Sequence, residues 1–337
     1  MTIKDIAAKT GYAVGTVSRA LNNHPNVSEK ARKAVMAVVE AQGFELNANA
    51  KHLKQTHGDS ILVVVKGRGN ELFADIVERL QAIFAPTDYP LIIDYIDELD
   101  SEVHRAAVLC REKKPLGILF LGGSHMNFQA EFSKIQVPAV LVTGDARELG
   151  FPNLSSVCTD DRQGAACAVD YLIRCGHRHI AVLGGDRLLS DTSERRYEGC
   201  AEAFEKNGMQ FDEQTYYHTG RYSYEDGYSG MQAVLRRTPE VTAVFAMADV
   251  IAIGAIRALV DAGKRVPDDI SIIGYDGLKI GSFYTPKLST VSQSVEHLAR
   301  RSFSVLMDCA ERGGHARHMT VPFTLSNRES VRKLENS

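Results

Sequence analysis

Apolar residues recur every three to four positions through the first 40 residues, in three stretches. The first two stretches each place their apolar positions on one face of a helix: Ile3, Ile6 and Ala7, then Val17, Ala20 and Leu21. They meet at Thr10-Gly11, and a glycine between amphipathic segments is typical of a tight turn. Thr2 and Asp5 form a capping-box-like start to the first helix. The pattern predicts a helix-turn-helix.

A third helix is predicted after Pro25, which breaks the second one. Ser28 is placed to cap this helix. Its apolar positions complete a small three-helix core: Ala31, Val35, Val38 and Val39. A helical bundle with a polar face, without DNA binding, is the alternative interpretation of these residues.

The second helix keeps a polar side once its apolar residues are buried. That side carries residue types that bond phosphates and base edges, so it is a candidate reader of the DNA major groove. We expect Arg19 to read a base, because arginine pairs bidentately with guanine. Val14 and Gly15 would discriminate by shape and thymine-methyl contact. Phosphates would be held by three polar residues: Thr16, Ser18 and Asn22.

From Ser60 the pattern changes to apolar runs that alternate with amphipathic helices. A first series predicts strands at 61–65, 91–95, 116–121 and 139–142, with helices at 73–84 and near 101–111. A second series predicts strands at 179–183, 243–247 and 270–273, with helices at 162–175, 193–207, 224–237 and 250–262. Strands alternating with helices indicate doubly wound parallel sheets, and two series indicate two lobes.

Composition agrees with a cytoplasmic protein of two or three domains. The chain has 337 residues, of which 44% are apolar, and no stretch reaches the length of a membrane span. Its six cysteines form no C-x-x-C pair, so we expect reduced, mostly buried thiols. Residues 1–57 carry eight Lys and Arg against four Asp and Glu, a balance of +4, which leaves −7 for the rest of a chain whose total is −3. A basic head on an acidic body suits DNA binding by the head.

Several motifs together resemble the lactose-repressor (LacI) family. Those in the head are Asp5-Ile-Ala, Thr16-Val-Ser-Arg-Ala-Leu-Asn22 and Asn47-Ala-Asn-Ala-Lys-His-Leu53. Those in the body include Gly176-His-Arg-His-Ile-Ala, Arg196-Tyr-Glu-Gly199, Val266-Pro-Asp-Asp-Ile-Ser-Ile-Ile-Gly-Tyr-Asp276 and Asn327-Arg-Glu-Ser330. The resemblance covers nearly the whole chain.

The resemblance implies an α/β architecture: a helix-turn-helix head joined to a two-lobed, doubly wound parallel-sheet body like that of periplasmic binding proteins. The head would span 1–46, a hinge helix or linker 47–58, and the effector-binding and dimerisation domain 59–334. One lobe would comprise 59–160 and 292–317, and the other 161–291 and 318–334. The chain would cross between lobes near residues 160, 291 and 318.

The segment 47–58 is expected to fold as a hinge helix when two copies meet on DNA. By resemblance, Leu53 would wedge into the minor groove, with Ala50 beside it and Asn47 near the backbone. Two residues depart from the family pattern. Ala13 stands where a capping Ser is usual, and Leu46 replaces a common Pro before the hinge. A plain flexible linker is the alternative for this segment.

A ligand cleft is expected between the lobes, at the carboxyl ends of the strands. Asp276 could accept hydrogen bonds from ligand hydroxyls, and Arg196 could donate a bidentate fork. Phe73 and Tyr222 could supply apolar faces for a sugar or a base. The alternatives are a structural ion pair for the charged residues and ordinary core for the aromatic ones.

Two further cleft positions depart from the pattern of sugar-sensing relatives. Ala248 stands where many carry Asn, and Thr143 where several carry Asp, which suggests a less hydroxylated or differently shaped effector. We expect Asp249 to be structural and to cap the helix that follows it.

The sequence therefore predicts a DNA-binding transcriptional regulator, most simply a repressor of carbohydrate-utilisation genes. It would act in the bacterial cytoplasm and nucleoid as a homodimer on a near-palindromic operator, controlled by a sugar-like effector. A purine-like ligand, a partner protein, or a simple sugar-binding module are the alternatives. No nucleophile, phosphate-loop or metal motif is present, so we expect neither an enzyme, a cofactor nor a metal site. The pair His177 and His179 is typical of a turn into a strand.

Overall fold

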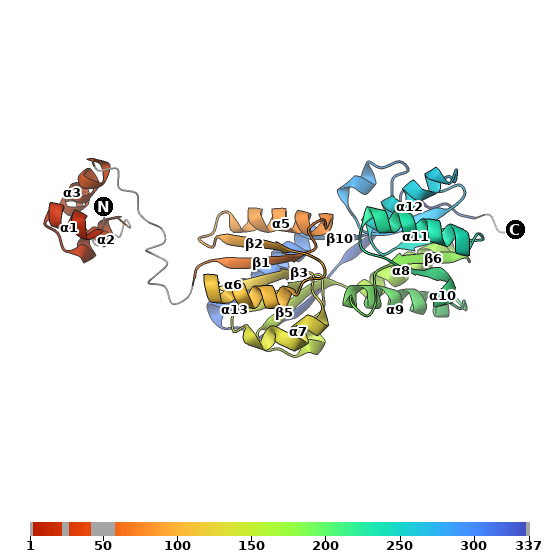
Figure 1. Ribbon diagram of the computed structural model, residues 1–337, viewed down its shortest axis with the longest axis horizontal. Coiled ribbons are helices and arrows are strands. Elements are labelled where there is room, and N and C mark those ends of the chain that lie inside the picture. The colour runs from red at the N-terminus through yellow and green to blue at the C-terminus, as the bar shows by residue number, and fades with distance from the viewer. Residues whose placement is uncertain (1–2, 22–26, 42–57, 335–337) are drawn as a thin grey trace. The chain divides into compact units, whose positions relative to one another are not determined.

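The computed structural model describes residues 3–21, 27–41 and 58–334. The chain divides into two compact units, a head up to residue 56 and a body from residue 57 (Figure 1). Across the described ranges, none of the helices is both long and apolar enough to cross a membrane.

The head contains three helices: α1 (Ile3–Thr10), α2 (Val14–Leu21) and α3 (Glu29–Ala41). Five side chains, one to two from each helix, form its buried core: Ile6, Ala7, Val17, Ala20 and Val35. Gly11 has a φ of 72°, a left-handed conformation that glycine adopts without strain, and it ends α1. The Ser28 hydroxyl accepts a hydrogen bond from the Ala31 amide at 3.3 Å, which confirms the predicted cap.

The first lobe of the body is built on a six-stranded sheet. Its strands are β1 (Ile61–Lys66), β2 (Leu91–Ile96), β3 (Gly117–Leu121), β4 (Ala139–Val142), β5 (Leu154–Thr159) and β11 (His318–Val321). They lie in the order β11-β5-β4-β3-β1-β2, and every neighbouring pair is parallel. Continuous apolar runs form the central strands because both faces of the sheet are covered.

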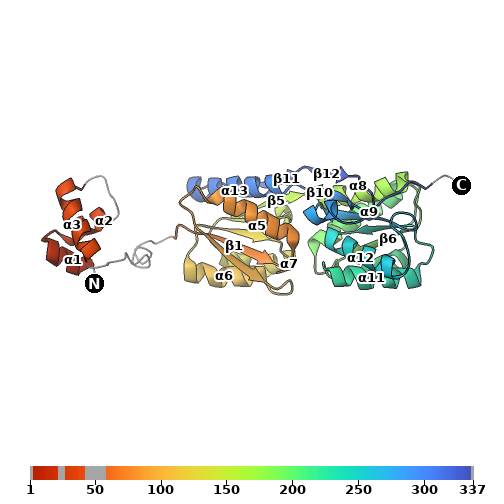
Figure 2. The ribbon, with the colours of Figure 1, turned by 90° about the horizontal axis from the view of Figure 1, so that it is seen from above.

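Helices cover both faces of this sheet (Figure 2). One face packs against α5 (Glu71–Phe84) and α13 (Val295–Arg312). The other packs against α6 (Glu102–Lys113), α7 (His125–Glu131) and the 3₁₀ turn η1 (Phe132–Lys134). A second 3₁₀ turn, η2 (Arg147–Leu149), follows β4.

The second lobe repeats this plan. Its strands are β6 (Ile180–Gly184), β7 (Tyr217–Thr219), β8 (Ala243–Ala246), β9 (Ser271–Asp276), β10 (Ser289–Gln293) and β12 (Phe323–Ser326), in the order β12-β10-β9-β8-β6-β7. Only β12 runs antiparallel to its neighbour among these paired strands. One face packs against α8 (Asp161–Arg174) and α9 (Asp191–Lys206), the other against α11 (Tyr224–Arg237) and α12 (Asp249–Asp261). The short elements α10 (Glu213–Tyr216) and η3 (Lys279–Ser282) complete the lobe.

The chain passes between the two sheets three times: after β5, after β10 and between β11 and β12. The predicted fold class is confirmed, but two crossings differ from the prediction. Because β10 continues to Gln293, the second crossing lies at Ser294 and not near 291. Because β11 belongs to the first sheet, the third lies at Pro322 and not near 318.

Candidate functional site

The exposed side of α2 is the candidate nucleic-acid surface of the head. Val17 and Ala20 face the core, whereas Gly15 and Arg19 are exposed and the Val14 side chain is 46% exposed. The Arg19 Nε donates to the Gly15 carbonyl at 3.2 Å, one helical turn back. This bond holds the guanidinium along the outer face of the helix, where it can exchange the carbonyl for a base edge.

Part of the predicted DNA contact set is outside the described residues. Asn22, Asn47, Ala50 and Leu53 lie there, as do Thr2 and Pro25, and the side chain of Ser18 is likewise not described. Thr16 is described and is half-buried. Its amide donates to the Ala13 carbonyl at 2.8 Å, so Ala13 begins α2 without a side-chain cap.

Arg196 is the centre of a buried charged cluster in the second lobe. Its side chain is 5% exposed, and its Nε donates to the Asp161 carboxylate at 2.8 Å. Its Nη2 lies 3.7 Å from Asp276, and Nη1 donates to the Met247 carbonyl. The guanidinium also stacks on the Tyr275 ring, 3.7 Å from its centroid. Burial lowers the pKa of Arg196, but the Asp161 charge more than compensates, so the pKa rises and the cation persists.

Asp276 ends β9 with its carboxylate 11% exposed and bonded to the Gln293 amide at 2.9 Å. Burial raises the pKa of Asp276 to about 6, although the Arg196 charge and the Gln293 bond lower it. Asp249 beside it is fully buried, and burial followed by the Asp276 charge raises its pKa to about 8. Two carboxyl groups are therefore held in a place that disfavours their charged forms.

The expected role of Asp249 as a helix cap is wrong. Ala248 occupies the cap position of α12 and makes no side-chain cap bond. The Asp249 carboxylate instead accepts from the Leu278 amide at 2.7 Å and from the Thr290 hydroxyl at 2.7 Å. It therefore ties the loop after β9 to the hinge strand β10, a structural role of another kind.

The remaining predicted effector residues are distributed over both lobes. Tyr222 donates or accepts at the Ser193 hydroxyl at 2.9 Å and lies close enough to Arg196 for their charges to interact. Ala248 follows Met247, whose carbonyl binds Arg196, and is buried. Phe73 lies in the first lobe, and its ring packs against the backbone of Gly122, directly after β3. A Cβ built on Gly122 would lie 2.9 Å from this ring. Thr143 directly follows β4.

Backbone strain marks two of these positions. Among the described residues, three that are not glycine have a positive φ: Lys114, Thr143 and Asp276. Thr143 has a φ of 73° and Asp276 a φ of 112°. Such conformations cost about 1–3 kcal/mol for residues with a Cβ, and they concentrate at functional sites. Two of the three lie at the carboxyl ends of strands that face the other lobe.

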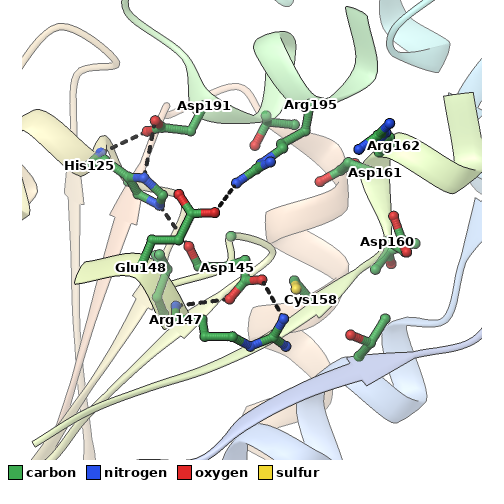
Figure 3. A pocket seen from close by; sticks show the side chains of 16 residues that line it. His125, Asp145, Arg147, Glu148, Cys158, Asp160, Asp161, Arg162, Asp191 and Arg195 are labelled. Carbon is green, nitrogen blue, oxygen red and sulfur yellow. Dashed lines mark hydrogen bonds and ion pairs between the residues drawn. The ribbon is translucent and has the colours of Figure 1, made fainter. Parts of the chain in front are cut away.

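A cavity of about 220 Å³ opens beside this cluster (Figure 3). Residues of both lobes line it, including Gly123, His125 and Glu148 from the first, Asp191, Thr192 and Arg195 from the second, and the connection Thr159–Arg162. None of the six predicted effector residues lines it, but Asp161 does and also holds Arg196. The cavity and the Arg196 cluster therefore share a wall.

Polar contacts join the lobes at two sides of the cleft. At the cavity, Asp191 accepts from the His125 amide at 2.7 Å, and Arg195 pairs with Glu148 at 2.8 Å (Figure 3). Elsewhere Arg221 pairs with Glu98 at 3.0 Å, and the Tyr224 hydroxyl donates to Glu71. These contacts hold the two lobes together across the cleft.

Sequence reasoning missed the cavity residues His125, Glu148 and Asp191. They lie in loops and first turns, and no local motif marks them. Their position at the carboxyl ends of β3, β4 and β6 is the one signal that could have identified them. The His177 ring is fully buried and bonds the Thr242 hydroxyl and the Arg332 carbonyl, a structural role. Within the described residues, no group of three or more His, Cys, Asp or Glu could hold a metal ion.

Comparisons with known proteins agree with both units. Residues 2–47 match the model of bacterial regulatory proteins of the lacI family, and 169–331 match a periplasmic binding protein-like domain. The HTH-type transcriptional regulator MalR of Clostridium butyricum is 32% identical, over 98% of this chain and 99% of its own. A transcriptional regulator CelR–cellobiose complex is 27% identical with a TM-score of 0.72, covering 98% and 99% of the two chains. A lac repressor dimer bound to operator, 23% identical, has the same fold with a TM-score of 0.84 over 98% and 99%.

The match to MalR spans both the head and the body at an identity that establishes common descent. The head carries the helix-turn-helix with its polar second helix, and the body carries two parallel sheets joined by three crossings. This chain is therefore a DNA-binding transcriptional regulator that belongs to the lacI family of bacterial regulatory proteins.

Proposed function

We propose that this regulator is a repressor that binds a near-palindromic operator as a homodimer and responds to a small carbohydrate bound between its two lobes. It would act in the cytoplasm, at the nucleoid when bound to DNA. The observation that carries the proposal is that the chain has both an exposed polar helix in the head and, in the body, a cavity lined by both lobes that shares Asp161 with the cluster of Arg196 and Asp276.

Operator reading would rest on α2. Val14, Gly15 and Arg19 would contact bases, while Thr16, Ser18 and Asn22 would hold phosphates. The segment 47–58 would order on the operator, with Asn47, Ala50 and Leu53 at the minor groove.

Arg19→Ala is the matching test. Its loss of a bidentate base contact should cost about 1–3 kcal/mol on the operator and little on random DNA. Fluorescence anisotropy at fixed salt would measure both. Lys9→Ala, which changes a charge on α1, serves as the control. Equal losses on both DNAs for Arg19→Ala would mean that Arg19 contacts only the backbone.

The effector site would join the cavity to the Arg196 cluster. Asp276 would accept hydrogen bonds from ligand hydroxyls, and Arg196 would hold the Asp276 carboxylate in place. Phe73 and Tyr222 would flank a ring, and Thr143 and Ala248 would shape the floor. A relative of this fold binds cellobiose, and the cleft here offers carboxylate, guanidinium and aromatic groups of the kind that recognise sugars.

The homodimer is supported by exposed apolar side chains on the second lobe. Phe283 is 77% exposed, Val260 54% and Ile280 39%, and they lie around η3 and the end of α12. Large apolar side chains that are this exposed favour a protein interface. Sedimentation of the full chain at micromolar concentration should give the mass of two chains, and Phe283→Asp should lower it to one.

Thermal melting of the full chain against mono- and disaccharides would test the effector. A true ligand stabilises the folded protein by mass action, by about 2.7 kcal/mol at a hundredfold excess over Kd, and therefore raises the melting temperature. The same ligand should change operator affinity, because a coupling of about 1–3 kcal/mol is typical of linked sites. A ligand that binds without changing operator affinity would contradict the switch. No response to any sugar would contradict the carbohydrate effector.

A further inference from the structure

The charges around the cavity are distributed unequally. Five carboxylate residues line it against three arginines: Asp145, Glu148, Asp160, Asp161 and Asp191, with Arg147, Arg162 and Arg195. Carboxylates therefore exceed guanidinium groups by two. Burial, and then the charges of Asp145 and Asp161, raise the pKa of the Cys158 thiol in the cavity wall to about 12, which agrees with a negative environment.

Every arginine that lines the cavity already has a carboxylate partner. Arg195 lies 2.8 Å from Glu148, and Arg162 lies 2.8 Å from Glu202 on α9. Arg147 lies 3.7 Å from Asp145, an ion pair without a hydrogen bond. A ligand carboxylate or phosphate that approached any of these guanidinium groups would lie beside the carboxylate that already pairs with it.

The deeper arginine is occupied as well. The Arg196 Nε donates to Asp161 and its Nη1 donates to the Met247 carbonyl. The planar face of the guanidinium stacks on Tyr275, and Nη2 lies 3.7 Å from Asp276. An anion usually binds arginine through a fork of two parallel N–H groups. No such fork is left, so Arg196 can orient Asp161 and Asp276 toward hydroxyl donors but offers no anion site.

Two other cations at the carboxyl ends of the first sheet do not alter this balance. Lys66 ends β1 and lies 2.6 Å from Glu102, a fully buried carboxylate. Arg68 follows in the next loop and does not line the cavity. Within the described part of the chain, two of the cavity carboxylates have no arginine or lysine partner: Asp160, which caps α8 through the Gln163 amide, and Asp191, whose contacts are the His125 amide and, at 3.3 Å, the His125 ring.

We infer that the effector of this regulator carries no negative charge, so that the cleft accepts neutral sugars or amino sugars and rejects sugar phosphates and uronates. The inference rests on the proposed carbohydrate effector and narrows its chemical class. An anion entering the cleft would lose its hydration and meet an excess of carboxylates, with each arginine that lines the cavity already paired with a carboxylate. Hydroxyl and ammonium groups, in contrast, can donate to these carboxylates.

Matched ligand series on the full chain test this directly. Glucose, cellobiose, glucosamine, glucose 6-phosphate and glucuronate, with the corresponding galactose, mannose and ribose compounds, would be compared by thermal melting and calorimetry. Within the series that binds, the phosphate and the uronate should bind at least about tenfold more weakly than the neutral member, or ~1.4 kcal/mol. An anionic member that binds as tightly as its neutral counterpart would overturn the inference.

Charge-removing variants separate this effect from shape. Asp160→Asn combined with Asp191→Asn keeps both side-chain acceptors and the α8 cap, yet removes two negative charges. In this variant, the difference in affinity between the neutral sugar and its phosphate should become smaller. Asp268→Asn is the control, because its side chain is 56% exposed and pairs with Arg265 at the opposite end of β9. If Asp268→Asn reduced this affinity difference equally, the charges of the cavity itself would not be its cause.

A labelling experiment reads the sign of the cavity without any sugar. Thr320 lines the cavity and is exposed, so Thr320→Cys places a thiol there. The cationic reagent trimethylammonium-ethyl methanethiosulfonate should label this thiol faster than the anionic sulfonato-ethyl reagent does. The ratio of the two labelling rates should be about tenfold higher here than at the exposed reference Gln210→Cys. Equal ratios at both sites would overturn the inference. The expected ratio without any sugar binding would refute the carbohydrate effector while upholding rejection of anions.

Discussion

Replacing Asp276 by Asn should stabilise the protein at neutral pH while abolishing its effector response. The carboxyl group has a pKa of about 6 in the folded chain, against an ordinary value of 3.8. Between these values the folded state binds more protons than the unfolded state, so stability falls as pH rises. The penalty is absent well below pH 3.8, grows from about pH 4 to pH 6, and is constant above.

The size of the penalty follows from the shift. About two pKa units at 1.36 kcal/mol each give roughly 3 kcal/mol at pH 7. This figure already includes the attraction of the ionised carboxylate to Arg196, because that charge lowers the pKa of Asp276. The Gln293 amide can still donate to the Asn oxygen, and the Arg196–Asp161 pair is untouched.

Urea denaturation at pH 4.5, 5.5 and 7 would measure the effect. The stability difference between Asp276→Asn and the parent should grow by about 2 kcal/mol across this range, because about 1 kcal/mol of the penalty is already present at pH 4.5. Asp268→Asn, at an exposed ion pair, should run parallel to the parent. Curves for Asp276→Asn that are also parallel to the parent would refute the argument that burial disfavours the Asp276 charge.

Three further substitutions test the backbone strain at Thr143, the uncapped start of α2 and the ion pair between the lobes. Thr143→Gly should stabilise the body by about 1 kcal/mol, because the strain of a φ of 73° exceeds the added chain entropy of glycine, and Thr143→Ala, which keeps a Cβ, should show no such gain in urea denaturation. Ala13→Ser should stabilise α2 by about 1 kcal/mol, because the added hydroxyl offers a side-chain acceptor to the amides of the first turn. A higher melting temperature of the head by circular dichroism, with no such gain for Ala34→Ser, would support this. Arg195→Ala should weaken effector binding about twofold, since the pair with Glu148 spans the lobes but is 39% and 72% exposed and contributes only ~0.5 kcal/mol. Lys206→Ala removes the ion pair with Asp170 within one lobe and should leave the effector affinity measured by calorimetry unchanged. A tenfold loss of affinity for Arg195→Ala would contradict the small contribution expected of so exposed an ion pair.

The elements that sequence analysis identified share one property: each has a clear pattern of apolar positions. The head follows from apolar spacing, and Ser28 caps α3 as expected. Strands β1, β3, β4 and β8 are continuous apolar runs, so their burial on two faces was readable.

The strands that cross between the lobes were not predicted because they bury polar residues. In β5 and β10, Ser156, Thr159 and Thr290 are almost completely buried. Each is satisfied by a distant side chain: His318 at 2.9 Å, Gln293 at 2.8 Å and Asp249 at 2.7 Å. Partners so far apart in the chain leave no local signal, so the hydrophobic pattern ends where the hinge begins.

The candidate site divides in the same way. Arg196 and Asp276 could be proposed from their positions at strand ends, and they do lie together. The interlobe contact of His125 with Asp191 could not, because it depends on which loops face each other once both sheets are formed. Pattern locates the ends of strands, whereas the pairing of loops across a cleft requires the fold.

The three crossings also set the order in which a newly made chain can become a controlled repressor. The first sheet receives β11 and the second receives β12 from adjacent segments close to the C-terminus. On the ribosome, a head made first can fold long before either lobe is complete. A premature stop just before β11 therefore leaves a DNA-reading helix attached to a body that lacks a strand in each sheet, so control by effector is the last property that synthesis adds and the first that truncation removes.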